Sequence, residues 1–108
     1  MAQTITQVNP GSLLRMASGR ILDTGTVAAM TITLGFKPRY VKVVNNTSGD
    51  SEEWIEGMAD ASAMKSVAAG TTSLITENGI TQEDNGFIIG LDTDILVTSE
   101  QLSWIALG

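Results

Sequence analysis

The stretch Thr31-Ile-Thr-Leu-Gly-Phe-Lys-Pro-Arg-Tyr-Val-Lys-Val-Val-Asn45 decides the fold class of this chain. In its first part, Ile32 and Leu34 alternate with threonines, and this period of two is typical of a half-buried β-strand. In its last part, Val41 and Val43 show the same alternation. The proline between the two parts cannot donate to a β-ladder, so it separates two strands. The stretch therefore predicts consecutive β-strands joined by a short turn.

The same pattern continues outward from this stretch. Strands are expected at 25–34, 39–45, 51–56, 87–89, 95–97 and 102–107, and a hairpin at 71–83. The hairpin prediction rests on Asn78-Gly79, a dipeptide typical of two-residue turns. A second turn is expected at Glu83-Asp84-Asn85-Gly86, because these residue types favour turns.

The sequence does not decide the secondary structure of two segments. Residues 58–69 carry apolar side chains at a spacing of three to four, which favours a short helix, although Ser66-Val67 fits a strand equally well. Residues 12–20 fit either a weak helical turn or a loop. The sequence thus predicts an all-β protein, a single small β-sandwich or barrel-like domain of about eight short strands at residues 25–108. An extended N-terminal arm at residues 1–24 precedes it, and at most one short helix is expected.

Length and composition exclude several function classes. The chain has 108 residues, 12 acidic and 6 basic side chains, no His and no Cys, and a net charge of −6. Disulfides, Cys or His catalysis and His-bound metals are therefore excluded. The acidic balance argues against nucleic-acid binding, which depends on Lys and Arg. No apolar segment approaches the length of a membrane span. Neither a nucleic acid nor a membrane is therefore expected as a partner.

The charges are unevenly distributed along the chain. Residues 1–49 carry five basic side chains and one acidic one, whereas the residues after Lys65 carry six acidic side chains and no basic one. This asymmetry fits complementary contacts within the fold or between copies, and it also fits an ordinary solvated surface.

Carboxylates are the only plausible catalytic groups. Glu52, Glu53 and Glu56 flank Trp54, which suggests a glycosidase-like pair beside an aromatic ring. An exposed acidic edge strand explains the same residues better, because a small β-domain seldom builds a catalytic cleft. Catalytic residues and cofactors are accordingly not expected.

One further carboxylate motif has a spacing that suits a metal ion. Asp92-Thr93-Asp94 could contribute oxygen ligands to Ca²⁺, but no complete calcium loop surrounds it. A turn in which the Asp side chains bind the backbone is favoured instead, and no metal is expected.

The stretch at 31–45 also resembles a run found in small structural proteins of tailed bacteriophages. The similarity extends over residues 25–108. It includes the segments Glu53-Trp54-Ile55-Glu56-Gly57-Met58, Ala68-Ala69-Gly70-Thr71, Gly79-Ile80-Thr81, Asn85-Gly86-Phe87-Ile88-Ile89-Gly90 and Leu102-Ser103-Trp104-Ile105-Ala106.

The resemblance implies a non-enzymatic virion protein that is similar to head decoration (cement) proteins. Such proteins bind the outer surface of the capsid and clamp neighbouring capsid subunits, often as trimers. The implied partners are the major capsid protein and further copies of the chain. The resemblance also implies that the chain is made in the bacterial host cytoplasm and lies on the outer surface of the capsid in the virion.

The alternative is a tail-fibre or carbohydrate-binding module of the phage tail, with Trp54 or Trp104 stacking on a sugar. The alternating residues around Trp104 place that ring in the core, so Trp54 is the better candidate. For the decoration hypothesis, the residues expected at the capsid or subunit interface are Ile5, Val8, Arg15, Arg20, Phe36, Lys37, Arg39, Tyr40 and Trp54.

Overall fold

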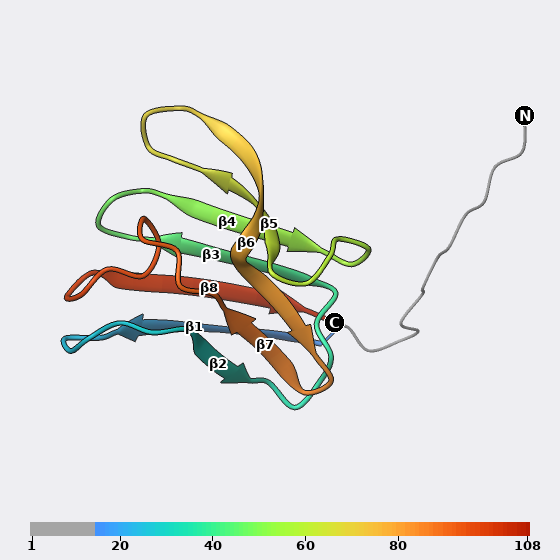
Figure 1. Ribbon diagram of the computed structural model, residues 1–108. Coiled ribbons are helices and arrows are strands. Elements are labelled where there is room, and N and C mark those ends of the chain that lie inside the picture. Colours follow the sequence, from blue (N-terminus) through green and yellow to red (C-terminus); the bar gives the residue numbers. More distant parts are fainter. Residues whose placement is uncertain (1–14) are drawn as a thin grey trace, which may run out of the picture.

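The structure is a computed structural model that describes residues 15–108. It contains eight antiparallel strands in one sheet, with the order β1-β8-β3-β4-β5-β6-β7-β2 (Figure 1). The strands are β1 (Met16–Leu22), β2 (Met30–Thr33), β3 (Tyr40–Asn45), β4 (Ser51–Ile55), β5 (Ser62–Ser66), β6 (Thr72–Glu83), β7 (Gly86–Ile89) and β8 (Gln101–Leu107). The all-β prediction is therefore confirmed, and residues 15–108 contain no helix that could span a membrane.

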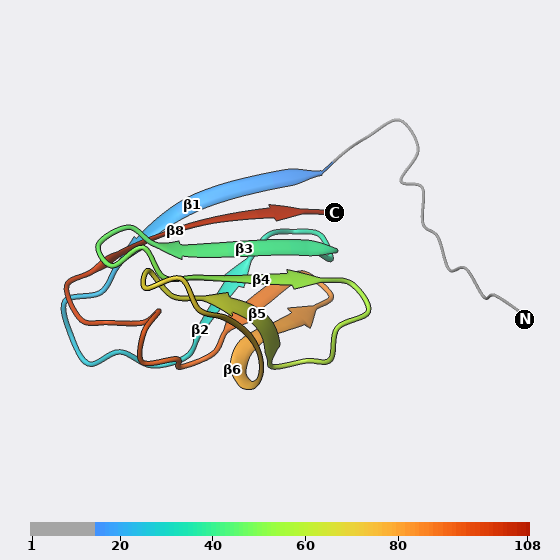
Figure 2. The ribbon, with the colours of Figure 1, turned by 90° about the horizontal axis from the view of Figure 1, so that it is seen from above.

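The sheet curls into a half-barrel because β6 bends in its middle (Figures 1 and 2). Ser62 of β5 pairs with Ile80, whereas its neighbour Ala63 pairs with Ile75, so residues 76–79 bulge out of the ladder. Such a bulge bends its strand and increases the local twist. The first half of β6 thus pairs with β5, and its second half carries β7 and β2 across the inner face.

The core lies between the two halves of the curled sheet. Alternate residues of β3, β4 and β8 point inward and meet side chains from β6 and β7. The phenyl ring of Phe87 packs edge-to-face on Trp104, with ring centroids 5.5 Å apart. The buried cluster consists of Val41, Val43, Trp54, Ala63, Ile80, Phe87, Ile89, Ile95, Leu96, Leu102 and Ala106.

The hairpin predicted at Asn78-Gly79 is wrong, because β6 runs through both residues without reversing. Asn78 has a positive φ of 61°, as the hairpin prediction required, but this conformation serves the bulge. Gly79 is needed there for space, since a Cβ at this position would lie 2.5 Å from the carbonyl carbon of Ser62. The second predicted turn is confirmed, as residues 84–85 connect β6 to β7.

The helix expected within residues 58–69 is also wrong, because β5 occupies residues 62–66. Ala61 has a positive φ of 66°, which is incompatible with a continuous helix through this segment. β5 instead pairs with both β4 and β6. The strand expected at 95–97 is a turn, in which the amides of Ile95 and Leu96 donate to the carbonyl of Asp92.

The expected boundary between arm and domain at residue 25 differs from the structure. Met16–Leu22 forms β1, a full strand paired with β8 along its whole length, so residues 16–22 belong to the sheet. Alternation was hard to detect there, because Ala17 and Gly19 occupy inward positions that normally carry large apolar residues. Gly19 is required by packing, since a Cβ would lie 2.7 Å from Cζ2 of Trp104.

Candidate interaction surface

The outward side chains of six neighbouring strands, β1, β8, β3, β4, β5 and β6, form what we call the outer face. Cross-strand partners point to the same side of a sheet, so the register places Met16, Leu107, Tyr40 and Ile55 in one row. Five apolar side chains of this face are strongly exposed, namely Met16 (63%), Leu22 (61%), Ile55 (56%), Met64 (41%) and Leu74 (60%). Exposed apolar groups gathered on one face are typical of a contact surface.

The middle of the outer face carries polar side chains, two of which form a hydrogen bond between strands. The hydroxyl of Tyr40 donates to Oε2 of Glu53 across the β3–β4 pair at 2.7 Å. Burial, together with this hydrogen bond and the carboxylate charge, raises the pKa of Tyr40 to about 12. Lys42 lies between Ile105 and Glu53 in the register. Arg20 extends the face onto β1, where it lies opposite Ser103.

Three basic residues from the sequence prediction meet at one end of the sheet, which we call the basic end. The amide of Gly108 donates to the carbonyl of Arg15, and the amide of Arg39 donates to the carbonyl of Leu107. A Cβ on Gly108 would lie 3.1 Å from the carbonyl oxygen of Lys37. Arg15, Lys37 and Arg39 therefore surround the end of β8, although they come from the residue before β1 and from the β2–β3 connection.

Two predicted contact residues are not available at the surface. Trp54 is 1% exposed and its indole N–H donates to the carbonyl of Ala59, so its ring offers no platform for a sugar or a partner. Phe36 is 9% exposed, and its ring packs against Gly108. Ile5 and Val8 lie outside the described residues.

The carboxylates around Trp54 do not form a pair. Glu52 points into the interior and is fully buried, whereas Glu53 points to the outer face. The expected acidic edge strand is wrong, because β4 pairs on both sides, with β3 and β5. Neither oxygen of Glu52 has a hydrogen-bond partner in the described part of the chain. Burial and, to a smaller extent, the Asp92 carboxylate raise the pKa of Glu52 to about 8, against the opposing effect of the Lys65 charge.

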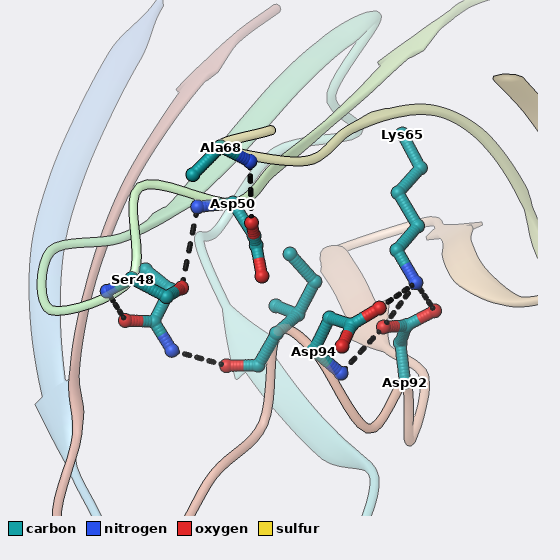
Figure 3. Close-up of polar contacts among 8 residues, drawn as sticks. Ser48, Asp50, Lys65, Ala68, Asp92 and Asp94 are labelled. Carbon is teal, nitrogen blue, oxygen red and sulfur yellow. Dashed lines mark hydrogen bonds and ion pairs between the residues drawn. The ribbon is translucent and has the colours of Figure 1, made fainter. Parts of the chain in front are cut away.

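The Asp92-Thr93-Asp94 motif binds a lysine. Nζ of Lys65 lies 2.9 Å from Oδ1 of Asp92 and 2.7 Å from Oδ2 of Asp94 (Figure 3). The amide of Asp94 also donates to Oδ1 of Asp92, which is the turn that the sequence favoured. Although partial burial alone would lower the pKa of Lys65, the hydrogen bonds and charges of the two aspartates raise it. Within residues 15–108 no three carboxylates converge as a metal ion would require.

Sequence reasoning missed Met64 and Leu74 as surface residues. The apolar spacing that favoured a helix within residues 58–69 gave no reason to place Met64 on the surface. The segment Ser62-Ala-Met-Lys-Ser66 also alternates, with Ala63 inward and Met64 outward, and a strand assignment would have exposed the methionine. Comparisons with models of protein families, with curated proteins and with solved structures find no match to this chain.

Proposed function

We propose that the chain is a non-enzymatic structural protein of a bacteriophage virion, which binds the outer surface of the head and stabilises contacts between capsid subunits. The observation that carries this proposal is the outer face, on which Met16, Ile55, Met64 and Leu74 are exposed together. Side chains of this kind lose unfavourable contact with water when they are covered, at about 25 cal/mol per Å². A surface of this composition suits adhesion.

The basic end adds an electrostatic contribution. Both ion pairs among residues 15–108 involve Lys65, so Arg15, Lys37 and Arg39 have no acidic partner within this range. Positive charge at one end of an acidic protein orients it on a partner and speeds association. The resemblance of residues 25–108 to small phage structural proteins supplies the identity of the partner, the major capsid protein.

The proposal is tested with undecorated phage heads. We expect the purified chain to co-sediment with the heads and to raise the temperature at which they rupture. The triple variant Ile55→Ser, Met64→Gln, Leu74→Gln changes the outer face, and we expect at least tenfold weaker binding. Leu91→Gln is the matched control, because Leu91 is 40% exposed but lies in the connection after β7.

Two outcomes would overturn the proposal. One is the absence of co-sedimentation at any concentration of the wild-type chain. The other is immunogold labelling of intact virions that places the chain on the tail, which would support the tail-fibre alternative. No aromatic platform favours that alternative at Trp54, since its ring is buried.

A further inference from the structure

Within residues 15–108, the edge strand β1 has one side that no other strand pairs with. β1 lies at the end of the strand order, and its pairing partner in this range is β8. Figure 2 shows β1 at the margin of the sheet, with no other described strand beyond it. None of the backbone hydrogen bonds within residues 15–108 joins this free side to another strand. A seven-residue strand with unpaired amides and carbonyls is a template for another strand.

The direction of the backbone groups follows from one hydrogen bond. The amide of Gly108 donates to the carbonyl of Arg15, so the peptide groups of odd-numbered residues in β1 face β8. Peptide groups alternate along an antiparallel strand. The amides and carbonyls of Met16, Ser18, Arg20 and Leu22 therefore point to the free side, where an added strand would bind them.

The sequence of β1 and its flanks complements itself about Gly19. In an antiparallel pair centred on this glycine, Met16 faces Leu22 of the other copy, and Arg15 faces Asp23. Met16 and Leu22 are the two most exposed large apolar side chains of residues 15–108, at 63% and 61%. The pairing would cover Met16 and Leu22 in both copies, and it would also place Arg15 of each copy opposite Asp23 of the other.

From this match we infer that β1 is a self-recognition strand, through which two copies of the chain pair antiparallel about a twofold axis at Gly19. The pairing extends the outer face continuously from one copy into the other. Because the contact is isologous, each favourable pair occurs twice. The inference does not depend on capsid binding and holds for the isolated protein.

The register is specific, because a shift of the partner changes every pair. A slip by one residue turns side chains to the opposite face. A slip by two residues would bring Arg20 opposite Arg20 or Ser18 opposite Ser18, and it would separate Met16 from Leu22. Gly19 favours the centre, since two glycines meet without side chains at the axis, where Trp104 already fills the inner side.

Proline at the free side tests the pairing. We expect the full chain to sediment at twice its 11.4 kDa mass. Ser18→Pro removes an amide that faces the free side, so β1 keeps its ladder with β8 and loses its partner. We expect this variant to be monomeric with an unchanged circular dichroism spectrum, while the control Ser18→Ala remains dimeric.

Cysteine cross-linking tests the register and does not depend on the proline variant folding. The natural chain has no Cys, so the background is zero. Chains carrying Ser18→Cys and chains carrying Arg20→Cys are mixed and oxidised. Because residue 18 faces residue 20 of the other copy, we expect mixed disulfides in excess over either homodimer.

Each outcome of these two experiments either supports or overturns the pairing of β1 between copies. A monomer at all concentrations means that Arg15 and Arg20 protect the edge, and it overturns the inference. A dimer that persists in a folded Ser18→Pro variant also overturns it. Homodimer disulfides in excess over mixed ones would overturn the register, whereas a mixed product together with a monomeric proline variant supports the full inference.

Discussion

Glu52 is a carboxyl group in a place where ionisation is costly. It lies on β4 opposite Lys65 of β5, with the indole of Trp54 two residues away on the same face and Asp92 across the interior. Lys65 is engaged by Asp92 and Asp94, so its charge is shared. A buried carboxyl without hydrogen bonds favours the protonated form, and this explains the direction of its pKa.

We predict that folding stability falls as the pH rises from about 5 to 8. The pKa of Glu52 is about 8 in the folded state and lower in the unfolded state, so the folded state holds the extra proton in this window. The free energy of unfolding should therefore decrease by up to about 1.4 kcal/mol per pH unit. Urea unfolding across this pH range measures the slope.

The variant Glu52→Gln should abolish most of that slope, because an amide does not titrate. Glu56→Gln is the matched control, since Glu56 is exposed and directly follows the same strand. A wild-type stability that is flat over this range, or a slope that survives in Glu52→Gln, would contradict the assignment.

At the scale of elements, local pattern decided most strands and long-range pairing decided the exceptions. β3 and β8 were predictable because their alternation is strong and both faces are defined. β5 was missed because Ala61 and Ala63 carry little periodic signal, and its strand conformation depends on the edges of β4 and β6. The sequence predicts two strands of a hairpin in place of the single strand β6, because Asn78-Gly79 fits a hairpin turn and a bulge equally well. Only the pairing of Ile80 with β5 distinguishes the two structures.

The same reasoning explains the outcome for the candidate site. The basic residues Arg15, Lys37 and Arg39 were identified from chemistry alone, but their meeting point at the end of β8 depends on pairing between distant segments. Trp54 was misplaced because the sequence does not reveal which face of an alternating strand points inward when Glu52 shares that face.

The bulge in β6 yields a prediction about backbone conformation. Asn78 has a positive φ of 61°, which Asn and Gly tolerate and β-branched residues do not. We expect Asn78→Val to lower the free energy of unfolding by about 1–2 kcal/mol, whereas Asn78→Gly should change it little. Thermal unfolding of the two variants measures the difference. Equal stabilities would mean that the bulge relaxes to accommodate valine.

At the scale of the molecule, Lys65 connects the two halves of the fold. It lies on β5, and its aspartate partners lie in the connection between β7 and β8, which also carries the buried Ile95 and Leu96 (Figure 3). This connection has no ladder of its own in the described sheet. The ion pairs and the two apolar side chains therefore hold it against the sheet.

We expect Lys65→Met to destabilise the protein by about 3 kcal/mol, because it leaves the nearly buried carboxylate of Asp92 without a positively charged partner. Lys42→Met on the outer face is the control and should have an effect below about 0.5 kcal/mol. Hydrogen exchange should increase selectively in residues 91–100. Uniform exchange across all strands would argue against a local role for the ion pair.

The position of β8 in the sheet has a consequence for how the chain folds. β8 lies between β1 and β3, so the register joins residues 16 and 107. Until β8 docks, β1 lacks its neighbour in the described sheet, and β3 has only β4 beside it. Contacts between such distant segments give a high contact order, which slows folding to milliseconds or seconds in small β-proteins. During that interval a newly synthesised chain exposes unpaired strands, and chaperones or sister chains compete with β8 for them.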